Sequence, residues 1–171
     1  MACTITSTGR SFPCKDKIGG IKRVWVKVFD ADDWGTISAG VIPADTAITV
    51  HSWELTKNSG SFQQTVTSSV ENGTVFFSQV VELTLPNLGA TDNDDVYELL
   101  KNRLAVIIQD NNDNYMLMGH TTGAEATGGT VGTGTAKGDL NGYQIQLTAE
   151  EAIPAPFVSS SDANITFTAG S

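Results

Sequence analysis

The chain has 171 residues and a formal net charge of −9, and only 17% of its residues are charged. This length suits one domain with a full hydrophobic core, while the negative charge argues against a general nucleic-acid-binding surface, which needs clustered Lys and Arg. No apolar stretch approaches the roughly 20 residues that cross a bilayer, and the N-terminus lacks the basic and apolar regions of a signal peptide. We therefore expect a protein that is made in the cytoplasm and does not insert into a membrane.

Residues 1–23 are rich in Ser, Thr, Gly and Lys and show no regular hydrophobic period. We expect a flexible N-terminal arm here, followed by a single β domain over residues 24–171. The arm holds both cysteines, Cys3 and Cys14, which form no C-x-x-C pair. A zinc site is therefore poorly supported, and two reduced thiols are favoured over a disulfide. The basic residues of this region indicate a solvated entry segment; they are Arg10, Lys15, Lys17, Lys22 and Arg23.

The first half of the domain predicts a series of strands separated by polar turns. Val24, Val26 and Val28 alternate along the first strand and share one face. Asn72-Gly73 is typical of a tight hairpin between two strands rich in Thr, Gln, Val and Ser, which indicates a broad antiparallel sheet with one solvent face. Strands are expected over residues 24–29, 47–55, 62–68 and 74–85.

Residues 94–103 predict a short amphipathic helix laid against this sheet. Val96, Leu99 and Leu100 fall at helical spacing and form one apolar side. Thr91 or Asp92 can cap the start. Acidic residues follow at the positive end of the helix, as its dipole favours.

The segment after the helix predicts the central hairpin of the fold. Residues 104–108 are continuously apolar and rich in β-branched side chains, which suits a strand covered on both faces. Five Asp and Asn residues at 110–114 form the turn, and residues 115–118 are the returning strand.

The remainder of the chain predicts further strands around a Gly/Thr-rich segment. Residues 121–142 fit a flexible loop, or extended ribbons that become ordered only against a neighbour. Asn141-Gly142 is a second tight-turn pair. Strands are expected over residues 143–148, 157–158 and 165–167. The fold class is thus all-β, an antiparallel β-sandwich or barrel with one short flanking α-helix.

The turn at residues 110–114 contains an acidic motif. Asp110-x-Asn112-x-Asn114 copies the first half of an EF-hand calcium loop. Tyr115 then stands where that loop needs Gly, and Thr121 where it needs Glu. We therefore interpret the motif as a hairpin tip and expect no bound metal.

The other polar residues predict no catalytic site. The acidic turn at 30–35 is interpreted as solvated, and His51 and His120 as ordinary sheet residues. Glu150 and Glu151 have no recognisable partner arrangement, and the chain has no nucleophile elbow, phosphate-binding loop or zinc-protease motif. We expect a protein that is not an enzyme and carries no cofactor.

A family resemblance covers about residues 55–158. An Asn-Ser-Gly-Ser-Phe-Gln-Gln-Thr-Val-Thr strand leads to a Glu-Asn-Gly-Thr hairpin. Farther on, an Asp/Asn hairpin leads to an aromatic and apolar strand, a glycine and a Gly/Thr-rich stretch. Gly-Asp-x-Asn-Gly-Tyr then opens a strand, and Pro-Ala-x-Phe-Val closes the segment. This pattern of turns resembles structural proteins of tailed bacteriophages, most of all tail tube proteins.

The resemblance implies a fold, a function and partners. Tail tube proteins form a β-sandwich or barrel with a flanking helix and assemble into stacked, usually hexameric rings around a DNA channel. The implied partners are further copies of the chain, other tail proteins of the virion, and DNA that passes without specific binding. The implied location is the virion tail. A Thr- and Gln-rich sheet suits burial against identical copies, and an acidic channel lets phosphates slide past.

Two groups of residues are the expected sites of this function. Glu71 and Glu82, in the hairpin of the broad sheet, are expected to line the channel, although a one-residue change of register would turn Glu82 to the other face. The contacts between subunits are expected in the Gly/Thr-rich segment, at Gly123, Thr130, Val131, Gly132 and Gly134.

Two alternative functions remain besides that of a tail tube protein. One is another virion part, a capsid-decorating or head–tail joining protein, which the charge and fold class fit nearly as well. The other is a carbohydrate-binding β-sandwich with Trp25, Trp34 and Trp53 as stacking platforms, of which Trp34, in the Asp-rich turn, is the best candidate.

Overall fold

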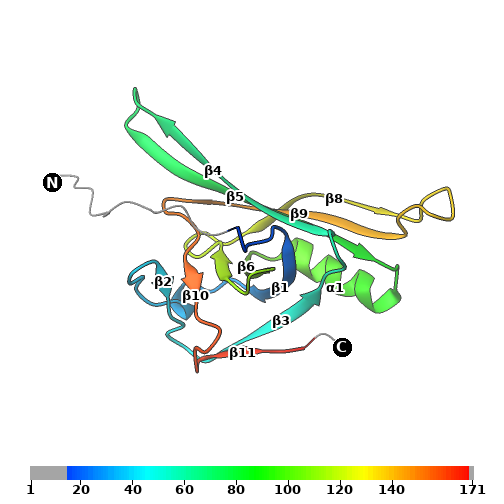
Figure 1. The fold of residues 1–171 in the computed structure, drawn as a ribbon, viewed down its shortest axis with the longest axis horizontal. Coiled ribbons are helices and arrows are strands. Elements are labelled where there is room, and N and C mark those ends of the chain that lie inside the picture. The colour runs from blue at the N-terminus through cyan, green and yellow to red at the C-terminus, as the bar shows by residue number, and fades with distance from the viewer. Residues whose placement is uncertain (1–14, 170–171) are drawn as a thin grey trace.

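The computed structural model describes residues 15–169 and consists mainly of strands in two sheets (Figure 1). The strand order is β11-β3-β1-β6-β7-β10-β2 in a seven-stranded sheet and β4-β5-β9-β8 in a four-stranded sheet. The prediction of an all-β fold with one flanking helix is confirmed. The prediction about the thiols of Cys3 and Cys14 lies outside the described residues. The strands are β1 (Ile21–Val28), β2 (Val41–Ile42), β3 (Ile48–Glu54), β4 (Gly60–Ser69), β5 (Thr74–Pro86), β6 (Leu104–Asp110), β7 (Tyr115–Met118), β8 (Glu125–Gly132), β9 (Gly142–Glu151), β10 (Phe157–Val158) and β11 (Ile165–Phe167), and the helices are η1 (Ala31–Asp33) and α1 (Ala90–Lys101).

The predicted central hairpin is β6 and β7, in the middle of the seven-stranded sheet. β6 pairs with β1 on one side and β7 on the other, and it is buried from Leu104 to Gln109. Its side chains alternate between two cores: Val106 and Ile108 face the four-stranded sheet, whereas Ile107 faces the opposite side. A strand covered on both faces is the expected home of a continuous apolar run.

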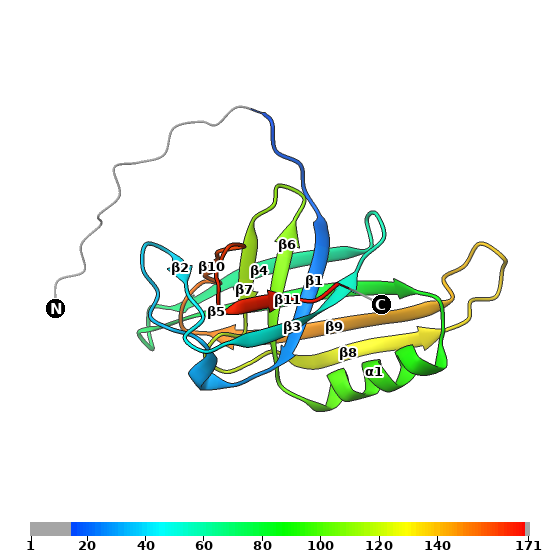
Figure 2. The ribbon, with the colours of Figure 1, turned by 90° about the horizontal axis from the view of Figure 1, so that it is seen from below.

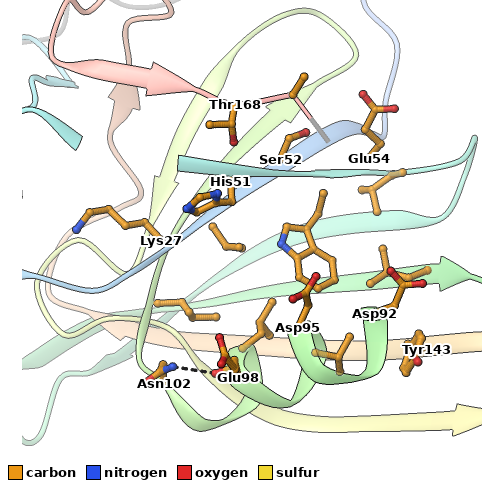
Figure 3. A pocket seen from close by; sticks show the side chains of 18 of the residues that line it. Lys27, His51, Ser52, Glu54, Asp92, Asp95, Glu98, Asn102, Tyr143 and Thr168 are labelled. Atoms are coloured by element: carbon orange, nitrogen blue, oxygen red, sulfur yellow. Dashed lines mark hydrogen bonds between the residues drawn. The ribbon is translucent and has the colours of Figure 1, made fainter. Parts of the chain in front are cut away.

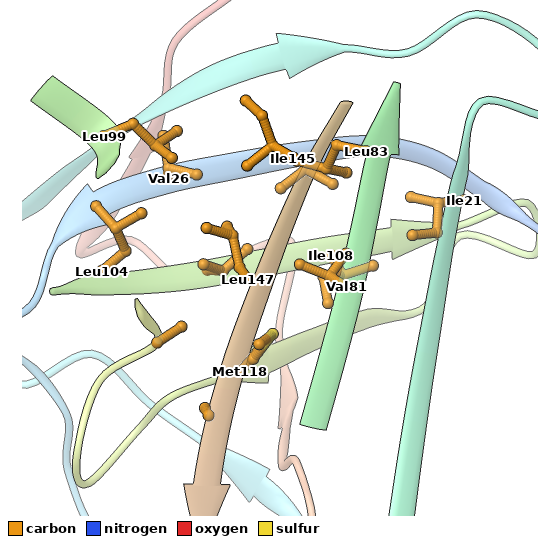
Figure 4. Packing of buried hydrophobic residues seen from close by; sticks show 14 of the residues in the cluster. Ile21, Val26, Val81, Leu83, Leu99, Leu104, Ile108, Met118, Ile145 and Leu147 are labelled. Atoms are coloured by element: carbon orange, nitrogen blue, oxygen red, sulfur yellow. The ribbon is translucent and has the colours of Figure 1, made fainter. Parts of the chain in front are cut away.

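The larger core lies between the two sheets (Figure 4). There Val26 of β1 and Ile108 of β6 pack against β5 and β9, which contribute Val81 and Leu147. The helix closes one end of this core with Val96 and Leu99. Each such side chain contributes about 1.5–3 kcal/mol through burial, so this core fixes the position of the four-stranded sheet.

A second core lies on the other side of the seven-stranded sheet, and it corrects the prediction for the acidic turn. Trp34 is buried there, and Trp25 stacks on Tyr115 with ring centroids 5.6 Å apart. Asp33 is also buried, where it pairs with Lys27 and accepts a hydrogen bond from Thr46. The turn is therefore solvated only in part, because its last residues fold under the sheet.

The helix begins four residues before the predicted start. Gly89 is the N-cap and makes no side-chain hydrogen bond, so neither Thr91 nor Asp92 caps the helix. The Gly89 carbonyl accepts hydrogen bonds from the Asn93 amide and the Tyr143 hydroxyl, which tie the helix start to β9. This tertiary contact decides the boundary, and it is invisible to a local capping rule.

Three further predictions need correction. β1 begins at Ile21, inside the predicted arm, and Val28 is 56% exposed at its end. Two short pairings, β10 with β2 and β11 with β3, are parallel in an otherwise antiparallel fold. Asn141-Gly142 is not a tight turn: Gly142 begins β9 so close to β5 that a Cβ there would lie 2.1 Å from the Leu85 carbonyl oxygen.

The Gly/Thr-rich segment is partly a strand. Glu125–Gly132 forms β8, which pairs with β9 of the same chain, and residues 133–141 form the loop between them. Of the two interpretations left open by the sequence, the extended ribbon holds for this part. Its partner strand lies within the subunit, so the ribbon is ordered without a neighbour.

Candidate functional site

The four-stranded sheet has one face on the core and one face open to solvent (Figure 1). Along β5, Val81 and Leu83 are buried, and Glu82 between them is exposed. The strand register carries this alternation across the sheet, so one polar surface, which we term the outer face, spans all four strands. Most of its side chains are short or uncharged hydrogen-bonding groups: Ser61, Gln63, Thr65, Thr67, Ser78, Thr84, Thr130, Gln144, Gln146 and Thr148. Phe76 and Val80 of β5 are apolar exceptions on the same face, and both are half-buried.

The charges on the outer face all have one sign. Strands β4, β5, β8 and β9 contain no Lys or Arg. Glu82 and Glu150 lie on the two central strands, β5 and β9, and Glu150 is near the end of β9. Glu125 lies at the rim of the face, where Arg103 is 3.6 Å away. Cations near this surface would be met by carboxylates, and phosphates would be repelled.

Within residues 15–169, neither edge of this sheet has a further strand partner. β4 pairs with β5 alone, and β8 pairs with β9 alone. α1 lies alongside β8 but toward the other sheet (Figures 1 and 2), so the free edge of β8 has no strand partner among the described residues. Unpaired strand edges attract further strands, and these two edges carry neither Lys nor Pro, the residues that usually prevent such pairing.

The β4–β5 hairpin projects beyond the body of the protein (Figure 1). At the base of the hairpin Phe62 packs against the core. Toward its tip, Val66 and Val75 point to the same side as Phe62 but are 57% and 51% exposed. Val70, in the turn, is 95% exposed. The hairpin therefore presents an apolar strip that the described residues of its own chain cover only in part.

The structure places most of the predicted site residues on or beside this sheet. Glu82 is exposed on the outer face, and Glu71 is exposed in the β4–β5 turn. Thr130 and Gly132 lie on the outer side of β8, and Val131 on its other side is 61% exposed. Two predicted interface residues stand apart: Gly134 in the loop after β8, and Gly123, which is buried against Phe29 and Arg103 of its own chain.

The acidic motif begins at Asp110, the last residue of β6, and forms a clamp that holds Ile18, in the segment before β1. Asp110 accepts hydrogen bonds from the backbone and side-chain nitrogens of Asn112 and Asn114. Asn112 in turn binds both the amide and the carbonyl of Ile18. The carboxylate is thus used inside the turn. Burial opposes its ionisation, but the hydrogen bonds outweigh burial and hold the pKa of Asp110 below its ordinary value.

We expect Asp110→Ala to lower the free energy of unfolding by about 1 kcal/mol near neutral pH. This value is small for hydrogen bonds to a charged group, because solvent screens the charge at the tip of the β6–β7 hairpin. The folded pKa is lower than the unfolded one, so this stabilisation is present above the unfolded pKa and lost as the pH falls through the folded pKa. Urea unfolding at about pH 7 and about pH 3 measures it. Asp32→Ala, at an exposed carboxylate, is the control. An equal effect of Asp110→Ala at both pH values would contradict the clamp.

A buried polar cluster beside β9 was missed by sequence reasoning. Glu150 points outward, whereas Glu151 is only 2% exposed and accepts 3.0 Å hydrogen bonds from the amides of Thr121 and Thr122. His120 Nδ1 lies 3.6 Å from Glu151 Oε2. The cluster pins the segment between β7 and β8 to the end of β9. No local signal reveals it, because its partners lie about thirty residues away.

The three Trp residues of the carbohydrate-binding alternative differ in exposure. Trp25 and Trp34 are buried in the second core, so neither presents a stacking platform for a sugar, whereas Trp53 is half-buried. Within residues 15–169 no three His, Cys, Asp or Glu side chains come together as a metal site. No helix in the same range is both long and apolar enough to cross a membrane.

Comparison with protein-family models, with curated proteins and with solved structures finds no match for this chain.

Proposed function

We propose that the chain is a bacteriophage tail tube subunit, which assembles through its four-stranded sheet into stacked rings around a DNA channel. One observation carries the proposal: the outer face is free of Lys and Arg, rich in Thr and Gln, and bounded on both sides by unpaired strand edges. The other partners of the proposal are the remaining tail proteins of the virion. No catalytic step is part of it.

The two free edges favour a head-to-tail contact between copies. Strand directions alternate across β4-β5-β9-β8, so β4 of the next copy placed beside β8 continues the antiparallel order. Such a contact joins two different surfaces, and it closes into a ring when the rotation between copies closes. Ring closure removes both edges, which are otherwise a liability for a soluble protein.

The composition of the outer face suits the wall of a channel. Proteins that hold DNA neutralise phosphates with Lys and Arg, and each neutralised phosphate adds to the affinity. Here the wall would offer mostly hydroxyl and amide groups, with a sparse set of carboxylates that includes Glu82 and Glu150 and with two half-buried apolar side chains, Phe76 and Val80. DNA would pass close to this surface and would not be retained.

Sedimentation across a concentration series, followed by negative-stain electron microscopy, tests the proposal. We expect particles several times the monomer mass with a central opening, and short tubes at the highest concentrations. A strict monomer at every concentration would contradict self-assembly. Closed particles without an opening would favour the capsid-decorating alternative. A monomer that binds sugars would favour the carbohydrate-binding alternative.

A further inference from the structure

A cleft of about 1070 Å³ lies between α1, β3 and the ends of β1 and β5 (Figure 3). Its floor is apolar: Val26 and Leu99 are buried there, and Trp53, Leu55 and Leu85 are half-buried. An apolar floor of this kind gains free energy when another chain covers it.

The rim of the cleft is acidic. Asp92, Asp95 and Glu98 line one side along α1, and Glu54 of β3 stands on the other (Figure 3). Arg23 pairs with Glu54, but within the described residues the three α1 carboxylates have no ion-pair partner. Lys27, the lysine of the cleft, is bound to Asp33. The electrostatic complement of this rim is therefore a segment that carries Lys or Arg.

The N-terminal segment of the chain has that character. Among residues 1–17, Arg10, Lys15 and Lys17 are basic, and Asp16 is the one acidic residue. Phe12 adds a large apolar side chain that suits the floor. Fourteen residues precede Lys15, and in extended form they reach about 46 Å.

Residues 15–20 run away from α1, which carries three of the four carboxylates of the cleft rim. Ile18 is fixed to Asn112 at the tip of the β6–β7 hairpin, whereas α1 leads into β6 at its opposite end, Leu104. Figure 2 shows residues 15–20 leaving the end of β1 on the side away from α1. We propose that the cleft receives the basic N-terminal segment of a neighbouring copy. This inference rests on the self-assembly proposed above and adds to it the contact that links neighbouring copies.

Cross-linking between two versions of the full chain tests the contact. The first carries Thr56→Cys at the exposed rim of the cleft, with Cys3→Ser and Cys14→Ser. The second carries Cys3→Ser alone, so its one thiol is Cys14. After mixing and treatment with a short bis-maleimide, we expect a mixed dimer joined between Cys14 and position 56. It should form at least about tenfold more than with Thr36→Cys, an exposed control outside the cleft.

Charge exchange then separates docking from chance contact. Asp95→Lys with Glu98→Lys in the first version should abolish the mixed dimer, and Arg10→Glu, Lys15→Glu and Lys17→Glu together in the second should restore it. Equal cross-linking of Cys14 to position 56 and to position 36 would overturn the inference. So would a third version that carries Cys14 and Thr56→Cys in one chain, if it forms the link only within that chain. If electron micrographs show rings but no mixed dimer forms, this contact is refuted and the proposed tail tube function stands. If no rings form, the proposed function itself is refuted.

Discussion

Val66→Glu combined with Val75→Glu should abolish ring formation at concentrations where the unaltered chain assembles. The two valines lie on the same face of the projecting β4–β5 hairpin, and in the free chain about half of each side chain is exposed. If assembly covers this strip, each valine contributes about 1 kcal/mol, half of the full burial value. A carboxylate in the same place would be desolvated without a partner, which costs several kcal/mol more.

The expected result is a weakening of self-association by at least about a hundredfold, since 1.4 kcal/mol corresponds to a factor of ten. Sedimentation velocity across a concentration series measures it. Thr65→Glu with Thr67→Glu is the matched control, because it places the same number of charges on the same hairpin but on its outer face. Both variants should keep the unfolding transition of the unaltered chain, as all four positions are exposed. If the valine variant assembles at the same concentrations as the unaltered chain, the apolar strip is not part of a subunit contact.

The sequence predicted those parts of the fold whose signals are local. Residues 104–108 are apolar on both faces, and the Asp and Asn residues after them set a turn, so the central hairpin followed from neighbouring residues alone. The same holds for the polar strand β4 and its long partner β5. The exposed face of Glu82 depends on register, and the core contacts of Val81 and Leu83 on either side of it decide that register in the structure.

The features that the sequence did not predict depend on distant partners. Trp34 is buried because strands from the other end of the chain cover it, as its place in one core with Val158 and Ile165 shows. The helix starts early because the Gly89 carbonyl meets the Tyr143 hydroxyl. The acidic cleft is equally non-local, since α1 and β3 lie about forty residues apart. A free edge such as that of β8 also has no sequence signature, because only the sheet order identifies it.

The second prediction with a large effect tests whether the outer face lines the proposed DNA channel. Glu82→Lys combined with Glu150→Lys should turn a surface that repels DNA into one that retains it. Both residues are exposed on the outer face, on the adjacent strands β5 and β9, and in a ring every copy would add two lysines to the wall. Exposed charges contribute little to folding, and neither carboxylate has an ion-pair partner within the described residues. Assembly should therefore survive the change.

Binding of a fluorescent duplex to assembled particles at several salt concentrations measures the effect. The unaltered particles should retain no DNA, and the variant should bind it with an affinity that falls steeply as salt increases, because each phosphate contact releases counterions. Asp32→Lys with Asp94→Lys adds the same charge at exposed positions outside the outer face and serves as the control.

In virions, the Glu82→Lys and Glu150→Lys variant should release DNA slowly at low salt and at the normal rate at high salt. Glu71→Lys should add to the delay if the β4–β5 turn also lies along the channel. Two results would mean that the outer face does not line a DNA path: equal DNA retention by the control, or normal DNA release by the variant at both salt concentrations. A capsid-decorating role would then explain the fold better.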